Sequence, residues 1–187
     1  QNQCYRKILV ILLSRNPALW VKSWPGICGG DRFLHKVNLS DQIQKAKITA
    51  VDISTKALQI AKQNNKLHNT KVQFIKSNLL PKTPTNFDII IANLPYVPEK
   101  FYKQNHQNLK HEPKLALVDK NKNGDLYIKL FAQINALQVK PKNLILEIDP
   151  ELVSQLKIKI KQLFPNSKTT IYKDIHKLNR FIMVDFT

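Results

Sequence analysis

The sequence is poor in residues that cross-link small domains or bind structural metals. Its two cysteines, Cys4 and Cys28, give neither a disulfide framework nor the spacing of a metal site. Histidines at four positions also lack metal-ligand spacing; they are His68, His106, His111 and His176. We therefore expect no metal centre. So little use of cysteine is also typical of a reducing cytoplasm, which is the location we expect.

Long apolar runs are missing as well. The run at residues 8–13 is far shorter than the roughly 20 residues that a membrane-spanning helix needs, and no small-residue cleavage site follows it cleanly. Internal repeats are absent too. We therefore expect one domain without a membrane or export segment, and 187 residues are enough for a hydrophobic core.

Acidic residues are scarce relative to basic ones. Thirty Lys and Arg against thirteen Asp and Glu give a formal charge of +17, which ordinarily suggests a nucleic acid or ribosomal partner. The basic residues are nearly all Lys, are spread along the chain and are mixed with many Asn and Ile, as an A+T-rich coding sequence would produce. No basic stripe or aromatic platform stands out. We therefore favour a compositional cause and do not expect a nucleic acid substrate.

From residue 47 onward, short apolar runs alternate with helical patterns, which is typical of an α/β fold. We expect strands at 47–51, 71–75, 87–92, 143–148, 169–173 and 180–186, and helices at about 55–67, 125–138 and 150–164. Asp149 and Pro150 suit the start of the last helix. The last two strands are joined by only a few residues, which favours an antiparallel closing pair. Polar loops are expected at 81–86 and 99–114, and the second is long enough to cover a site.

The most informative motif is Asn93-Leu94-Pro95-Tyr96, directly after the apolar run at 87–92. The Asn93 side-chain carbonyl can accept one N–H of a planar NH2 group, and the Leu94 carbonyl can accept the other. Pro95 keeps Leu94 extended, so this carbonyl has a set direction, and Tyr96 offers a flat face for stacking. With both hydrogens held, negative potential gathers on the nitrogen, which can attack an adjacent methyl sulfonium in line.

A second marker of a ligand site is the stretch at 47–54, in which a β-branched run ends at Asp52 and Ser54 follows two residues later. An acid at the end of a second parallel strand is well placed to bind both ribose hydroxyls of an adenosine-bearing cofactor. Each motif alone also fits a simpler interpretation, since the corner can be a turn and Asp52 a helix cap. Together, at the carboxyl ends of two strands where open α/β sheets bind ligands, they favour a ligand site.

The stretch at 46–186, about three quarters of the chain, resembles the protein-(glutamine-N5) methyltransferases that modify the GGQ glutamine of peptide-chain release factors. The resemblance implies a Rossmann-like S-adenosylmethionine-dependent methyltransferase fold, with a mostly parallel sheet and an antiparallel last strand. The motifs that carry it are Ala50-Val51-Asp52-Ile53-Ser54 with Ala57-Leu58, Asn93-Leu94-Pro95-Tyr96, Glu112-Pro113-Lys114-Leu115-Ala116-Leu117 with Gly124-Asp125-Leu126, Leu144-Ile145-Leu146-Glu147-Ile148, and Lys173-Asp174 with Arg180.

The resemblance implies roles for several residues. Asp52 would bind the ribose of S-adenosyl-L-methionine, with Asn78 and Leu79 near its adenine. Asn93 would bridge cofactor and substrate, while Leu94, Pro95 and Tyr96 would shape the glutamine pocket. The expected catalytic residues are Asn93, Pro95 and Tyr96. Two positions depart from the family. Leu94 replaces a proline, which should be tolerated because the backbone carbonyl of this residue, and not its side chain, forms the hydrogen bond. Asn78 replaces an Asp, which should weaken cofactor binding.

The family's first strand and Gly-rich turn are not recognisable before residue 46. The family has glycines there because only glycine lets the backbone come close to the cofactor, whereas this chain has Trp-Pro-Gly-Ile-Cys-Gly-Gly-Asp at 24–31. Shifting the genetic code by one base through this stretch permits Gly-x-Gly-Ser. We therefore predict a divergent or out-of-frame segment at 1–45 that replaces the first strand and loop. Residues 46–187 would be the catalytic domain, without the family's amino-terminal helical domain.

Three classes of function stay open. The first is methyl transfer to the GGQ glutamine of a release factor, which would be the protein partner of a monomeric enzyme. The second is an adenine-N6 methyltransferase on DNA or RNA, which would use the same corner and welcome a positive surface but would need a target-recognition region and a way to flip out the base. The third is a non-catalytic remnant of the glutamine methyltransferase. We favour the first.

Overall fold

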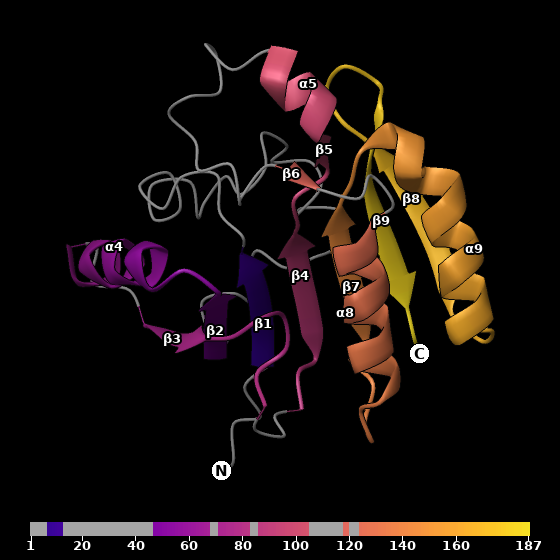
Figure 1. The fold of residues 1–187 in the computed structure, drawn as a ribbon. Helices are drawn as coiled ribbons and strands as arrows, with labels where there is room; N and C mark the ends of the chain where they lie inside the picture. Colours follow the sequence, from indigo (N-terminus) through magenta and orange to yellow (C-terminus); the bar gives the residue numbers. More distant parts are fainter. Residues whose placement is uncertain (1–6, 13–46, 68–70, 83–85, 105–117, 120–123) are drawn as a thin grey trace.

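A computed structural model describes residues 7–12, 47–67, 71–82, 86–104, 118–119 and 124–187 of the chain (Figure 1). Their main feature is a seven-stranded sheet with the strand order β3-β2-β1-β4-β7-β9-β8. The strands are β1 (Lys7–Leu12), β2 (Lys47–Asp52), β3 (Val72–Lys76), β4 (Ile89–Asn93), β7 (Asn143–Glu147), β8 (Lys168–Lys173) and β9 (Asn179–Asp185).

The sheet is parallel except at one edge. β1 runs parallel to β2 and β4, β2 to β3, and β4 to β7. β9 runs antiparallel to both β7 and β8. The predicted α/β class, with a mostly parallel sheet and an antiparallel last strand, is therefore confirmed, and the six predicted strands all form close to their expected bounds.

The central strand β1 corrects an expectation, because the sequence predicts no first strand before residue 47. β1 lies between β2 and β4, with Ile8 opposite both Ile48 and Ile89. A short run rich in Ile, Leu and Val is typical of a strand buried on both faces of a parallel sheet. Residues 13–46, including the stretch at 24–31, lie outside the described residues, so the out-of-frame segment there stays a prediction.

The helices also follow the predicted order, with differences at their ends. They are α4 (Thr55–Leu67), α5 (Glu99–Gln104), α8 (Asp125–Asn135) and α9 (Val153–Leu163), with a single 3-10 turn, η2 (Pro150–Leu152), before α9. Asp149 caps η2, because its side chain accepts a hydrogen bond from the Glu151 N–H at 2.9 Å. None of the helices in the described part of the chain is long and apolar enough to cross a membrane.

The loop predicted at 99–114 is wrong for its first residues, which form α5. This helix follows β5 (Val97–Pro98), which pairs in parallel with β6 (Val118–Asp119). Figure 1 places α5 and this small sheet beyond the carboxyl end of β4. α5 therefore lies where a cover for the candidate site was expected. Residues 105–117 fall outside the described residues.

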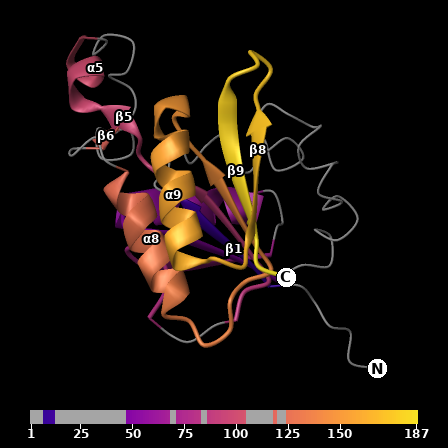
Figure 2. The same cartoon turned by 90° about the vertical axis from the view of Figure 1, so that its right-hand side faces the viewer.

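The hydrophobic core lies where α8 and α9 cover one face of the sheet (Figure 2). α8 buries four side chains against β4, β7 and β9, and α9 adds two more; they are Tyr127, Leu130, Phe131, Ile134, Leu156 and Ile160. The Phe164 ring packs edge-on against Phe131 and Phe186, with centroid distances of 6.2 and 5.0 Å. Burial of each such side chain contributes about 1.5–3 kcal/mol, so this layer holds the carboxyl-terminal half of the sheet in place.

Candidate active site

Two predicted site residues, Asp52 and Asn93, end parallel strands at the same level of the sheet. Asp52 is the last residue of β2, and Asn93 is the last residue of β4. Ile11 of β1 lies opposite both Val51 and Ala92, so the next residue of each outer strand stands at the same height, with β1 between them. At about 4.8 Å per strand spacing, the two backbones are roughly 10 Å apart. One nucleoside-sized ligand could contact both.

The Asp52 carboxylate is 5% exposed and orders the turn after β2. Its Oδ1 accepts a hydrogen bond from the Ser54 N–H at 2.6 Å. Ser54 in turn caps α4, because its Oγ accepts a hydrogen bond from the Ala57 N–H at 3.2 Å. The capping role therefore belongs to Ser54. The Asp52 backbone carbonyl also accepts a bond from the Ser77 N–H at 3.1 Å, which brings the turn after β3 to the same edge.

The turn after β3 holds Leu79 in the left-handed region, with φ at 72°. A leucine there costs of order 1–3 kcal/mol and persists only where the surroundings fix it. Two bonds do so: Ser77 Oγ donates to the Leu80 carbonyl at 2.7 Å, and the Leu80 N–H donates to Gln133 Oε1 at 3.0 Å. The Leu79 side chain is buried, while the Asn78 side chain is exposed. Of the two predicted adenine-binding residues, Asn78 is therefore exposed, whereas Leu79 as a whole is 1% exposed.

The Asn93 corner is tied to the neighbouring strand through one side chain. Asn93 Nδ2 donates to Glu147 Oε2 at 3.0 Å, and the Tyr96 hydroxyl donates to Glu147 Oε1 at 3.1 Å. Glu147 is the last residue of β7 and lies directly opposite Asn93 in the parallel register. The sequence alone does not assign Glu147 a role. Its position at the end of an apolar strand, as for Asp52 and Asn93, is the signal that could have identified it.

The backbone of the corner rests on Tyr127, which is fully buried. Its hydroxyl donates to the Glu147 carbonyl at 2.7 Å and lies 3.4 Å from the Leu94 carbonyl oxygen. A phenol has one hydrogen, and the shorter contact takes it. The Leu94 carbonyl therefore keeps acceptor capacity for another donor, as the predicted role of this oxygen requires. Leu94 as a whole residue is 1% exposed, and its side chain belongs to the hydrophobic core.

Gly124 explains why a Gly-Asp-Leu motif stands at the start of α8. Its φ is 64°, in the left-handed region that glycine adopts without strain. The Gly124 carbonyl accepts the first helical bonds, from the Tyr127 and Ile128 N–H groups at 2.9 and 3.1 Å. This start directs α8 so that the Tyr127 hydroxyl meets the carbonyl of Glu147. The motif at 112–117 lies outside the described residues.

An ion pair fixes the β8–β9 hairpin beside the corner. Arg180 Nε lies 3.1 Å from Asp174 Oδ2, and Arg180 Nη1 donates to the Ile148 carbonyl at 3.3 Å. Asp174 Oδ1 accepts from the N–H groups of His176 and Leu178 at 2.9 and 3.0 Å. Desolvation would raise the pKa of Asp174, but these bonds and the Arg180 guanidinium outweigh it and lower that pKa.

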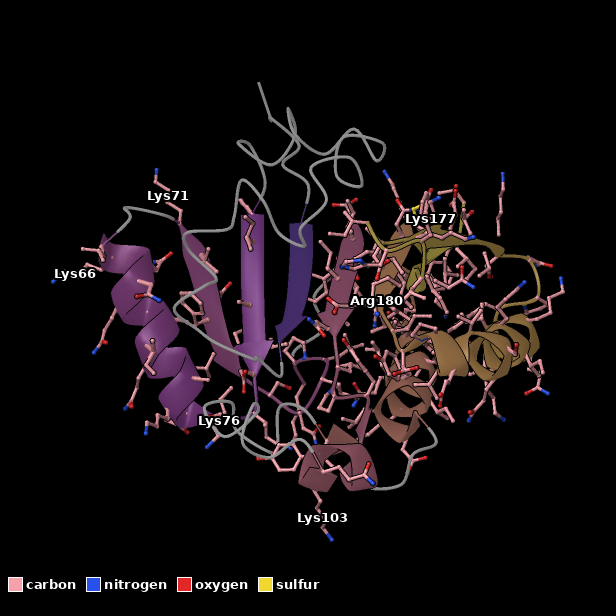
Figure 3. The ribbon with its side chains drawn as sticks, turned by 90° about the horizontal axis from the view of Figure 1, so that it is seen from above. Lys66, Lys71, Lys76, Lys103, Lys177 and Arg180 are labelled. Carbon is pink, nitrogen blue, oxygen red and sulfur yellow. The ribbon has the colours of Figure 1, made fainter. Side chains whose placement is uncertain are left out.

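Within the described ranges, no three His, Cys, Asp or Glu side chains group as a metal site; the cysteines and His68, His106 and His111 lie outside those ranges. Labelled lysines from four different segments lie around the outline of the molecule in Figure 3, on α4, β3, α5 and the β8–β9 turn, while Arg180 lies inside that outline. This spread agrees with a compositional origin of the charge.

Comparison with known proteins gives a consistent family. A family model described as "Methyltransferase small domain" matches residues 34–145. Release factor glutamine methyltransferases from Flavobacterium psychrophilum and Lactococcus lactis are each 30% identical to this chain, over 154 and 150 residues. The alignments cover 80% and 79% of this chain but 54% and 55% of those proteins. The chain thus spans about half the length of the curated relatives it matches.

A solved structure supports the fold. The ribosomal protein L11 methylase from Lactobacillus delbrueckii subsp. bulgaricus superposes with a TM-score of 0.54 at 15% sequence identity, covering 98% of this chain and 70% of that one. At this identity the likeness establishes the architecture of the sheet and its helices.

Proposed function

This chain belongs to the methyltransferase small domain family, and we propose that it transfers a methyl group from S-adenosylmethionine to the side-chain amide nitrogen of the GGQ glutamine of a peptide-chain release factor. The observation that carries the proposal is the level placement of Asp52 and Asn93 at the carboxyl ends of β2 and β4. The substrate class is supported by relatives named release factor glutamine methyltransferases.

The family and fold imply S-adenosylmethionine, which when bound supplies an electrophilic methyl group on a sulfonium. The described residues fit its nucleoside half. Asp52 offers a nearly buried carboxylate for the ribose hydroxyls, and Asn78 offers an exposed amide beside it for the adenine amino group. The family's Gly-rich turn, which would hold the rest of the cofactor, is not recognisable in this chain, and residues 13–46 lie outside the described residues.

The corner would orient the glutamine amide. Asn93 Oδ1 and the Leu94 carbonyl would each accept one amide hydrogen, and the Tyr96 ring would lie against the plane of the amide. Pro95 keeps the Leu94 carbonyl in a fixed direction. With both hydrogens held by acceptors, the corner would orient the nitrogen lone pair toward the electrophilic methyl group that the cofactor would supply, and one proton of the amide nitrogen would pass to solvent. The rate gain comes from positioning and electrostatics, without a strong base.

The adenine-N6 alternative uses the same corner and gains support only from the formal charge of +17. A direct test incubates the chain with methyl-labelled S-adenosylmethionine and either a purified release factor or adenine-containing DNA and RNA. We expect label in the release factor, and none when its GGQ glutamine is replaced by alanine. Label in nucleic acid alone would overturn the proposal in favour of the second class. Calorimetry that detects no cofactor binding would favour a non-catalytic remnant.

A further inference from the structure

We propose that Glu147 is a positioning residue that sets which end of the Asn93 amide faces the substrate and that fixes the Tyr96 ring beside it. The inference rests on the proposed function, because it concerns the same corner. It assigns the carboxylate at the end of β7 a part in the reaction without contact to the reacting atoms.

The first argument is the chemistry of the two ends of an amide. The NH2 and carbonyl ends of an asparagine side chain have almost the same shape, so packing alone selects weakly between them. Asn93 is useful to an incoming NH2 group only when its oxygen faces that group. In the reverse orientation, the Asn93 NH2 group would face the substrate NH2 group, and two hydrogen-bond donors would oppose each other. The corner therefore needs a neighbour that distinguishes the two ends.

Glu147 is such a neighbour because a carboxylate only accepts hydrogen bonds. Its Oε2 accepts a hydrogen bond from Asn93 Nδ2, with 3.0 Å between the two atoms. This bond turns Asn93 Oδ1 away from Glu147. Bonds to a charged acceptor are stronger than neutral ones and bias a two-state choice roughly 10- to 100-fold. An ionised acid in this position thus keeps almost all molecules in the orientation that accepts a substrate N–H.

The same carboxylate fixes a second side of the corner. Its other oxygen, Oε1, accepts the Tyr96 hydroxyl at 3.1 Å. The Tyr96 side chain is 9% exposed, and this bond anchors the outer end of its ring. Glu147 thereby couples the acceptor for the substrate amide to the surface on which the amide stacks. Because each oxygen binds one donor, a neutral glutamine could serve only one of the two.

The end of β7 is itself held in place, so the carboxylate keeps its position. The Glu147 carbonyl accepts the Tyr127 hydroxyl at 2.7 Å. The next residue, Ile148, donates its N–H to the Arg180 carbonyl at 2.9 Å and accepts Arg180 Nη1 at 3.3 Å. These contacts come from α8 on one side and β9 on the other. They add geometric support without touching the substrate.

The test compares Glu147→Gln with Glu151→Gln, the same isosteric change at an exposed position four residues along. We expect Glu147→Gln to lower kcat about 10- to 100-fold, with an unchanged cofactor Kd by calorimetry, and Glu151→Gln to change neither. In the Asn93→Ala background, Glu147→Gln should lower kcat by a smaller factor than in the wild type, since no amide remains to orient and only the Tyr96 contact is affected. Full kcat in Glu147→Gln, or an equal loss in the Asn93→Ala background, would overturn the inference.

A second readout separates this inference from the proposed function and does not need turnover. In protein labelled with ¹⁵N-asparagine, the Asn93 side-chain NH2 signal, identified by its loss in Asn93→Ala, should be protected from hydrogen exchange. Protection should fall in Glu147→Gln and persist in Glu151→Gln. If the chain methylates no release factor but this pattern is found, the function fails and the positioning role stands. An unprotected Asn93 NH2 in the wild-type protein refutes the role even if Glu147→Gln does not fold.

Discussion

The two halves of the sheet support their parts of the site in different ways. On the side of the sheet where we propose that the substrate binds, α8 alone buries Tyr127, Leu130, Phe131 and Ile134, and side-chain bonds join β4, β7, α8 and β9 around the corner. On the side where we propose that the cofactor binds (the cofactor side), α4 packs on β2 and β3 with a single buried residue, Leu58, and ends in Leu67, which is 77% exposed. Asp52 there accepts a hydrogen bond within its own turn, from the Ser54 N–H.

This difference in packing predicts that residues on one side affect the affinity for the cofactor and residues on the other side affect the rate of methyl transfer. A corner held by a packed core and by bonds from neighbouring elements keeps its geometry before any ligand arrives, so its residues should act on the rate of methyl transfer. The cofactor side has fewer buried contacts, so its residues should act on cofactor binding. Binding of the cofactor should in turn stabilise that side by mass action. The predictions below test this separation.

The largest expected effect is that of Asn93→Ala on turnover. Removing the oxygen that holds one substrate hydrogen should lower kcat by about 10²–10³-fold, as for loss of one preorganised partner of a transition state. Asn86→Ala, at an exposed asparagine before β4, is the matched control and should retain wild-type turnover. Single-turnover assays with labelled cofactor measure both. A fully active Asn93→Ala enzyme would refute the catalytic assignment.

Paired truncations in α8 and α4 test the difference in packing. Leu130→Ala removes a fully buried side chain and should cost about 2–5 kcal/mol of unfolding free energy. Leu58→Ala removes a side chain at the edge of a less buried interface and should cost clearly less. Denaturant unfolding followed by circular dichroism gives both values. Equal costs would contradict the comparison of the two halves.

Asp52→Ala should change cofactor affinity and leave the chemistry intact. Loss of a charged acceptor for hydroxyl groups should raise the cofactor Kd roughly 10- to 100-fold, while kcat at saturating cofactor stays near the wild-type value. Asp88→Ala is the control, because Asp88 precedes β4 at the amino end of that strand, away from Asp52, and its carboxylate forms a partly exposed ion pair with Lys142 at 3.8 Å. A normal Kd in Asp52→Ala would separate this acid from the cofactor.

The smallest expected effect concerns acid stability. The pKa of Asp174 in the folded protein lies below the ordinary value of 3.8. Its ionised form therefore stabilises the folded state above pH 3.8, and this contribution is lost as the pH falls through the lower folded value. Asp174→Asn should be less stable than wild type at pH 7, with the difference closing in strong acid. Urea midpoints measured along the pH scale give the comparison; a gap that widens in acid would contradict it.

Local patterns predict most of the fold, and tertiary contacts account for the rest. The β-branched runs and the helical periodicity after residue 47 identify six strands and the three main helices. The strand β1 is not predicted because its apolar run is far in sequence from the next recognisable element and no identifiable Gly-rich turn follows it. The short helix α5 lies in a polar stretch without a clear helical period, so its sequence reads as a loop.

The site divides in the same way. Asp52 and Asn93 can be identified because each ends an apolar strand with a polar residue next to a turn signal. Glu147, Tyr127 and Arg180 cannot be assigned from sequence, since their roles depend on which strands are neighbours and on the register between them. Glu147 meets Asn93 only because β7 lies beside β4. Strand order and register are therefore the information that local sequence patterns do not provide.

The most direct test of the account is to locate the methyl group. Release factor treated with S-adenosylmethionine and the chain is digested, and the peptide that carries the GGQ sequence is analysed by tandem mass spectrometry, in parallel with Asn93→Ala. The account predicts one added methyl group on the glutamine side-chain nitrogen with the wild-type chain and almost none with Asn93→Ala. An unmodified glutamine with cofactor-saturated wild-type chain, or equal modification by both proteins, would contradict it.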